Sequence, residues 1–133
     1  MSVRFALGAT IASIVLAAPV WAAEWEYVGR INTSEGWEFY SVDKTSVRLI
    51  GNQRTFWTKV ELITPDRDES YTARKSFWRL DCRQWTMAAV SEVRYDAAGN
   101  VVASVTDEIS LRPIVPETIG EAVAEYACKA PHR

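Results

Sequence analysis

The sequence has few of the residues on which enzymes depend. It contains one histidine, His132, which is followed only by Arg133. General acid–base catalysis near neutral pH usually relies on histidine or on a carboxylate with a shifted pKa. No serine lies in a G-x-S-x-G setting, and the six glycines are scattered and form no phosphate-binding loop. We therefore predict a protein that is not an enzyme and that carries no cofactor.

An excess of charge of one sign is also absent. The chain has 15 basic and 17 acidic side chains, a formal charge of −2, which gives no electrostatic reason to expect nucleic acid or an anionic membrane as partner. The only acidic cluster, Asp66, Asp68 and Glu69, lacks the glycine and the closing glutamate of a calcium loop. We interpret it as a solvated loop and predict no metal site.

Hydrophobic runs are short except at the N-terminus, where residues 1–22 are typical of a secretory signal peptide. Arg4 precedes the apolar run Phe5–Leu16, and small residues follow. The run is well short of the roughly 20 residues that cross a bilayer, which argues against an uncleaved anchor. Cleavage after Ala22 fits best, and cleavage after Ala23 is the alternative.

Removal of this segment leaves residues 23–133, a length that suits a single domain. Loss of Arg4 changes the formal charge from −2 to −3. No second hydrophobic run approaches membrane-spanning length. No cysteine lies near the cleavage site, so lipid attachment there is not expected. We expect an exported protein of the periplasm or the outer cell surface.

Cysteine is limited to Cys82 and Cys128. An even number of cysteines in an exported chain favours one disulfide. The alternatives are a redox pair, which would favour C-x-x-C spacing, and metal ligation, for which the single histidine is poorly placed. We predict a structural disulfide.

Side-chain character alternates with period two from Trp25 to Val105, a pattern typical of half-buried strands. Short polar connections separate the runs and require neighbouring strands to be antiparallel. Asp43-Lys44-Thr45-Ser46 suits a single helical or turn segment, and only Arg83 and Gln84 separate two of the strands. The predicted strands are Trp25–Ile31, Trp37–Val42, Arg54–Ile63, Tyr71–Cys82, Trp85–Tyr95 and Val101–Val105.

The pattern changes after Pro113 and Pro116, which we expect to end the strand region. A helix is predicted over Glu117–Ala127, opened by Pro116 in its first turn or by a capping box of Thr118 and Glu121. The fold class is therefore α+β: an antiparallel β-meander of about six strands packed against one C-terminal α-helix.

Helical periodicity predicts which side of this helix faces the sheet. Its predicted packing face consists of Ile119, Ala122, Val123 and Tyr126. On an ideal helix Cys128 would lie about 180° from Ile119. We therefore expect the helix to end before Cys128, so that the chain turns back toward Cys82.

The tryptophans admit two interpretations. Trp25, Trp57, Trp78 and Trp85 fall in the strand pattern, where most would fill a small core. Trp57 alternates with Phe56, so one of these two must face outward. An aromatic patch left on the uncovered face would form a binding surface.

Basic residues alternate with aromatics between residues 74 and 85. Long cationic side chains at these positions would attract acidic segments of a partner protein, although solvated strand faces would look the same. The candidate protein-binding residues are Arg74, Lys75, Arg79 and Arg83.

Several short motifs occur in a fixed order along residues 23–133. They are the segment Phe39–Val47, the Gly51-Asn52 turn with the strand Phe56–Val60, Asp81-Cys82, the hairpin Tyr95–Val102, and Ile114–Glu121 leading to Cys128. In this order they resemble the surface-adhesin protein E family of Gram-negative bacteria, which also includes the neisserial adhesin complex protein.

The resemblance implies an exported, non-catalytic binding protein with a sheet of about six strands and a helix tied back by a disulfide. Family members are described as binding host matrix or serum proteins such as vitronectin and laminin. The adhesin complex protein is also described as inhibiting C-type lysozyme, so a periplasmic or surface lysozyme inhibitor is the alternative function. The S-G-x-x-Y signature of a separate inhibitor family is absent. A homodimer is a further partner to consider, because a small sheet can leave an edge strand open.

Overall fold

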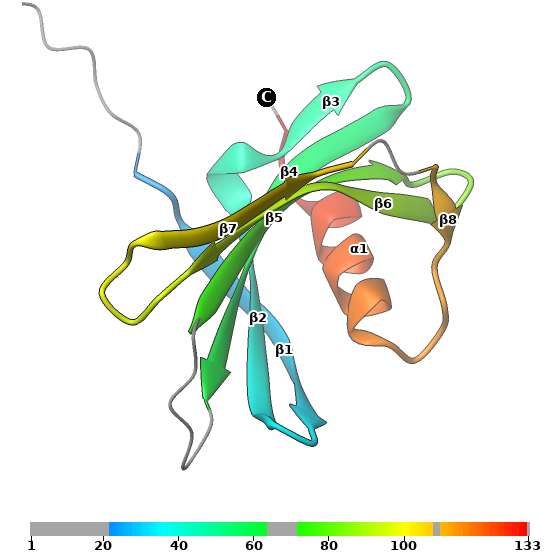
Figure 1. Cartoon of the computed structure of the whole chain (residues 1–133). Helices are drawn as coiled ribbons and strands as arrows, with labels where there is room; N and C mark the ends of the chain where they lie inside the picture. Colours follow the sequence, from blue (N-terminus) through cyan, green and yellow to red (C-terminus); the bar gives the residue numbers. More distant parts are fainter. Residues whose placement is uncertain (1–21, 64–71, 108–109, 133) are drawn as a thin grey trace, which may run out of the picture.

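The computed structural model describes residues 22–63, 72–107 and 110–132 (Figure 1). The expected signal peptide, apart from Ala22, and the acidic cluster Asp66, Asp68 and Glu69 lie outside the described residues. Six strands follow one another in an antiparallel sheet of order β1-β2-β4-β5-β6-β7, which confirms the predicted meander. They are β1 (Trp25–Thr33), β2 (Gly36–Asp43), β4 (Gln53–Ile63), β5 (Ala73–Asp81), β6 (Thr86–Tyr95) and β7 (Val101–Thr106).

Two short strands extend the meander. The predicted turn after β2 is the 3₁₀ helix η1 (Lys44–Ser46), in which the Asp43 carboxylate accepts a 3.0 Å hydrogen bond from the Thr45 backbone N–H. It leads into β3 (Arg48–Ile50), which pairs with β4 through the tight turn at Gly51. Gly51 has φ +61°, a conformation that glycine adopts without steric cost.

Pro113 does not end the strand region as predicted. It lies in β8 (Arg112–Pro113), a two-residue strand that pairs with β6 beyond the end of β7. Proline is tolerated there because β8 is an edge strand, and the neighbouring Ile114 N–H supplies a 3.1 Å bond to the Trp85 carbonyl.

The connection between β5 and β6 is also longer than predicted. Cys82 and Trp85 were expected in strands, but both lie in a four-residue turn. The Asp81 carboxylate stabilises this turn by accepting 2.9 Å hydrogen bonds from the backbone N–H groups of Arg83 and Gln84. Trp85 completes it with a left-handed backbone, φ 55°.

The helix α1 (Ile119–Lys129) begins and ends two residues later than predicted. The predicted cap forms with one change: the Thr118 hydroxyl accepts a hydrogen bond from the Glu121 N–H, and the Glu121 carboxylate accepts one from the N–H of Glu117, the residue before the N-cap, and not from that of Thr118. Pro116 lies outside the helix. At the other end, the Arg54 guanidinium on β4 donates to the carbonyls of Ala127 and Ala130 at 2.9 and 2.7 Å.

The prediction that α1 ends before Cys128 is wrong, because the helix presents a different face. Its fully buried residues are Val123, Ala124 and Ala127, so the packing face is centred roughly 90° from Ile119. Cys128 therefore flanks the sheet instead of pointing away from it. It forms the predicted disulfide with Cys82 from within the helix, with a Cα–Cα distance of 5.9 Å.

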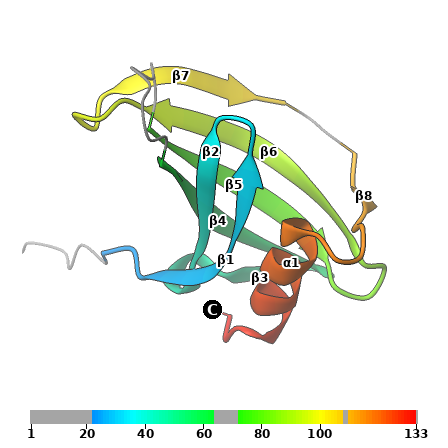
Figure 2. The ribbon, with the colours of Figure 1, turned by 90° about the horizontal axis from the view of Figure 1, so that it is seen from below.

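The core lies between α1 and one face of the sheet (Figure 2). Val42, Phe56 and Leu80 from β2, β4 and β5 are completely buried against the alanines and valine of the helix. The small alanine side chains let the helix lie close to the strands. The opposite face of the sheet has no helix over it among the described residues, and we call it the open face. No helix in the described part of the chain is long and apolar enough to span a membrane.

Candidate protein-binding surface

The open face gathers several of the aromatic residues that the core does not hold. Phe56 points to the helix and is completely buried, so Trp57 is the residue that turns outward. Trp57 lies opposite Phe77 on β5, with ring centroids 5.2 Å apart. Trp78 and Trp85 pack against the core as predicted, but Trp25 and Trp57 lie half-buried on the open face, so only two of the four tryptophans fill the core and not most of them.

Next to this pair lies an aromatic–basic cluster formed by Trp25, Lys59, Lys75 and Tyr95. Strand register places Lys59 directly opposite Lys75, where like charges destabilise a sheet. The Glu61 carboxylate, 3.1 Å from the Lys59 ammonium, and two aromatic rings compensate for this repulsion. The Lys59 and Lys75 ammonium groups lie 5.3 and 5.7 Å from the Trp25 ring centroid, and Lys75 lies 5.0 Å from that of Tyr95. The cluster thus holds two cations on an aromatic platform.

A broad hollow of about 580 Å³ continues the open face toward the β1–β2 hairpin. Tyr27 and Phe39 line it with ring centroids 6.3 Å apart, together with Glu61 and Ile63. Tyr27 and Ile63 are more than half exposed, at 58 % and 56 %. Large apolar side chains exposed side by side are typical of surfaces that contact other proteins.

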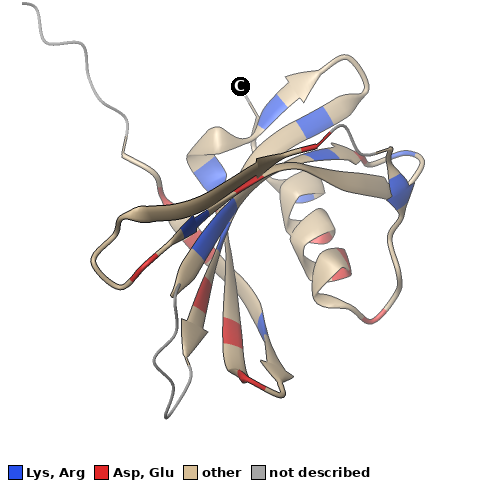
Figure 3. Ribbon diagram, in the orientation of Figure 1, with Lys and Arg blue, Asp and Glu red and all other residues tan. Residues whose placement is uncertain are grey.

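The four basic residues selected from the sequence do not share one surface. Lys75 and Arg79 lie on the open face, because they are two residues apart on β5. Arg74 points to the helix side of the sheet. Arg83 is exposed in the β5–β6 turn, at the end of the sheet that carries the disulfide. Figure 3 shows that the basic positions are distributed over several elements, among them β3, β4, β5 and the β5–β6 turn.

Arg74 is held in a network of charges. Its guanidinium donates two 3.1 Å hydrogen bonds to the Glu38 carboxylate and one of 3.0 Å to the Tyr40 hydroxyl. Burial opposes ionisation of Glu38, but the hydrogen bonds from Arg74 and Tyr40 outweigh it and lower the pKa of the carboxyl. Burial, and then the bond to Glu38, raises the pKa of Tyr40 to about 12. Arg74 is thus a structural residue of the sheet.

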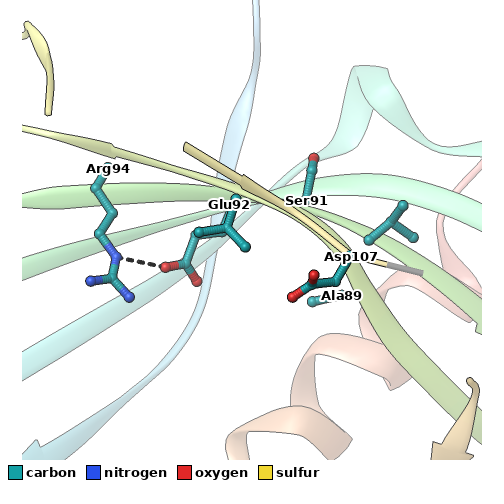
Figure 4. A pocket seen from close by; sticks show the side chains of 7 residues that line it. Ala89, Ser91, Glu92, Arg94 and Asp107 are labelled. Atoms are coloured by element: carbon teal, nitrogen blue, oxygen red, sulfur yellow. Dashed lines mark hydrogen bonds and ion pairs between the residues drawn. The ribbon is translucent and has the colours of Figure 1, made fainter. Parts of the chain in front are cut away.

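A smaller hollow of about 190 Å³ lies between β6 and β7 (Figure 4). Glu92, Arg94 and Asp107 supply its charged groups, and the Arg94 Nε lies 2.8 Å from a Glu92 carboxylate oxygen. Among the described residues, no three His, Cys, Asp or Glu side chains gather in a group that could hold a metal ion.

Sequence reasoning did not select Trp25, Lys59 and Tyr95 for the binding surface. The sequence indicated Lys59 in part, because Lys59 is two residues from Trp57 in the same strand and therefore faces the same side of the sheet. What brings Trp25 and Tyr95 to the same place is the register of distant strands, which local patterns do not contain.

Together these features describe a small disulfide-bonded α+β protein whose uncovered sheet face suits contact with another protein. The model of the family described as surface-adhesin protein E matches residues 25–129. The chain therefore belongs to the surface-adhesin protein E family, as the sequence resemblance predicted. This membership supports an exported surface adhesin with a protein as its partner.

Two solved structures of Haemophilus influenzae protein E share the fold. One matches with a TM-score of 0.55 and 16 % identity over 84 % of this chain and 90 % of that chain. The other, from crystal form II, matches with a TM-score of 0.53 and 15 % identity over 86 % of this chain and 95 % of that chain. No curated protein matches the sequence.

Proposed function

We propose that the protein is an exported, non-catalytic adhesin that binds a host matrix or serum protein, such as vitronectin or laminin, through its open sheet face. The observation that carries this proposal is the aromatic–basic cluster beside the hollow at Tyr27 and Phe39. Aromatic residues are enriched at the centre of protein interfaces. Two lysines on an aromatic platform add attraction for an acidic segment of the partner.

Export through the predicted signal peptide belongs to this proposal. Residues 1–22 would be removed, and residues 23–133 would form the single binding domain at the outer cell surface. Lys75 and Arg79 remain the proposed binding residues on the open face, with Lys59 beside them. Arg83, in the β5–β6 turn, remains a proposed contact at the end of the sheet. Arg74 contributes by holding the strands beneath them in register.

The experiment is a capture assay with the exported protein against vitronectin, laminin and C-type lysozyme in parallel. We expect capture of a matrix or serum protein. Replacement of Lys59 and Lys75 by alanine should reduce that capture at least fivefold while the melting temperature changes little. The matched control is Lys44→Ala together with Lys129→Ala, which removes two exposed cations away from the open face. Equal loss of capture in both double variants would contradict the assignment of the surface.

A second candidate function is inhibition of C-type lysozyme, a basic enzyme. The observation that favours it is acidic charge at one end of the sheet. Glu35 lies in the β1–β2 hairpin, and Glu61, which pairs with Lys59, lies near the end of β4, from which the chain continues to Asp66, Asp68 and Glu69. Capture of lysozyme alone, with loss of its activity at equimolar protein, would move the function from adhesion to inhibition.

A second copy of the chain is a further proposed partner. The edge strand β7 is exposed along its whole length and has neither a charged residue nor a proline. Such an edge is suited to strand addition. The other edge, β1, carries charged residues and an irregularity between Tyr27 and Gly29, and α1 packs beside it.

A further inference from the structure

Between the sheet and the first turns of α1 lies a cavity of about 250 Å³, which we call the helix–sheet cavity. It is on the opposite side of the sheet from the open face. Val60, Trp78, Met87 and Ile119 supply most of its apolar wall. This volume exceeds the roughly 150 Å³ that accommodates benzene in an engineered protein cavity. The space therefore suits one substituted ring.

One polar group in the wall lacks a partner. Ser76 is 96 % buried, lines the cavity, and its hydroxyl makes no hydrogen bond within the described part of the chain. A hydroxyl that lines the cavity and bonds to no other protein group is available to a guest, which would take the place of water there. The neighbouring Thr58 hydroxyl accepts a 2.9 Å bond from the Trp78 indole N–H and keeps its own O–H, whereas Ser76 makes no such bond, so Ser76 is the freer of the two hydroxyls for a guest.

The charges around the cavity favour a neutral guest. Arg74 and Glu92 line it, but Arg74 bonds to Glu38, and Glu92 forms an ion pair with Arg94 at 2.8 Å. Two carboxylates and two guanidinium groups thus balance each other locally. A charged guest would have to displace one of these pairs, whereas a neutral hydroxyl would not.

The wall also favours an aromatic guest over an aliphatic one. The Trp78 indole offers a ring face or edge, and the Met87 thioether makes favourable contacts with aromatic rings. We propose that the helix–sheet cavity binds a neutral phenol-class group, with the guest hydroxyl bonded to Ser76 and the ring between Trp78, Met87 and the helix. The group is either a free phenol or the tyrosine side chain of a bound protein. The proposal stands apart from the adhesin function, because a free phenol tests it directly.

The test uses the exported protein and three probes observed by fluorine NMR: 4-fluorophenol, fluorobenzene and 4-fluorobenzoate. We expect 4-fluorophenol to bind roughly three- to tenfold more tightly than fluorobenzene, the effect of one hydrogen bond. The carboxylate should bind most weakly. Tighter binding of 4-fluorobenzoate, or equal binding of the phenol and fluorobenzene, would overturn the assignment.

Substitutions in the cavity wall test whether the probes bind in the helix–sheet cavity. Ser76→Ala should bring 4-fluorophenol down to the affinity of fluorobenzene, whereas Ser104→Ala, on the exposed strand β7, should change nothing. Ala89→Leu should fill the cavity and abolish binding of both probes, with Ala98→Leu in an exposed turn as its control. Gly120→Leu serves as a second filling variant, because the nearest atom to a Cβ there is the Thr118 hydroxyl at 3.5 Å. Unchanged binding in a folded filling variant would overturn the proposal.

A competition arm distinguishes the two sources of the group. N-acetyl-tyrosinamide that displaces 4-fluorophenol would assign the cavity to a tyrosine side chain of a bound protein. Displacement by p-cresol but not by the amide would assign it to free phenols. Failure of capture in the adhesin assay would leave these outcomes unaffected, since no partner protein is present.

Discussion

The Glu38 carboxylate on β2 and the Arg74 guanidinium on β5 are joined by two hydrogen bonds of 3.1 Å that reach across the intervening strand β4. Both side chains are mostly buried, with 15 % and 18 % of their surface exposed. The Tyr40 hydroxyl completes the network by donating a 2.7 Å bond to Glu38. The pair therefore connects two strands that are not neighbours in the sheet, on the face that carries the helix.

Arg74→Ala should destabilise the fold, because it leaves the Glu38 carboxylate buried without its cation. Breaking a fully buried pair costs about 3–5 kcal/mol, and the residual exposure here lowers the expectation to about 2 kcal/mol. Urea unfolding at pH 7 measures the change. Arg83→Ala, in an exposed turn, is the control and should stay within about 0.5 kcal/mol of the parent. Equal stability of the two variants would contradict a structural role for Arg74.

The contrast between Arg74 and Lys75 also shows what the sequence could have supplied. Adjacent residues of a strand face opposite sides, so a binding patch that includes both could have been rejected from the alternation alone. The strands themselves were predictable, because alternation and turn residues are local signals. The connection after β5 was not, since its length depends on how the Asp81 carboxylate bonds to the turn.

The helix face shows a different limit. Hydrophobicity favoured Ile119 and Tyr126 for the packing face. In the structure, the small residues Ala124 and Ala127 are the ones completely buried against the sheet. Close approach of a helix to a sheet depends on the shape of both surfaces, and one-dimensional periodicity measures only polarity. The helix–sheet cavity could not be predicted for the same reason. Its lining includes Ser76 and Ile119, which are about 40 residues apart in the sequence, and local patterns do not show that they lie close together.

Tyr40 should give the protein a characteristic loss of stability at high pH. Its pKa is raised to about 12 by burial and by the bond to Glu38, so the folded state favours the protonated phenol. The stabilisation is complete below pH 10, the usual pKa of tyrosine, and is lost as the pH rises toward 12. In the folded protein, absorbance at 295 nm should show a late-titrating phenol that disappears in Tyr40→Phe.

The unfolding free energy of Tyr40→Phe should also fall less steeply between pH 10 and 12 than that of the parent. Comparison of variants is needed because lysines lose their charge in the same range. Tyr27→Phe, which removes an exposed phenol, is the matched control. An identical slope for Tyr40→Phe and the parent would show that the network does not hold the Tyr40 proton.

The disulfide should contribute more to stability than any single packing contact. It joins Cys82 and Cys128 across 46 positions of sequence, and the chain-entropy model gives about 4 kcal/mol for a loop of this length. The double variant Cys82→Ala and Cys128→Ala avoids a free thiol and should lose most of this stability in urea unfolding. The reduced parent should match it. A loss below about 1 kcal/mol would mean that the Arg54 bonds and the core hold α1 without the disulfide.

The edge of β7 gives a prediction about assembly. The Asp107 N–H donates to the Val90 carbonyl, and hydrogen-bonded pairs alternate along an antiparallel ladder. By this alternation the Val105 and Ala103 N–H groups face β6, whereas the Ser104 N–H points away from the sheet. Ser104→Pro therefore removes a donor that only an added strand would use.

Sedimentation velocity over a range of concentrations should show the parent protein forming a dimer and Ser104→Pro remaining monomeric. Far-ultraviolet circular dichroism should be the same for both, because the β6–β7 ladder is retained. Ser104→Lys should weaken the dimer as well, since a lysine on an edge strand opposes pairing with another copy. A dimer that survives both substitutions would place the contact elsewhere, and the open face, with its exposed Tyr27 and Ile63, would then be the surface to vary next.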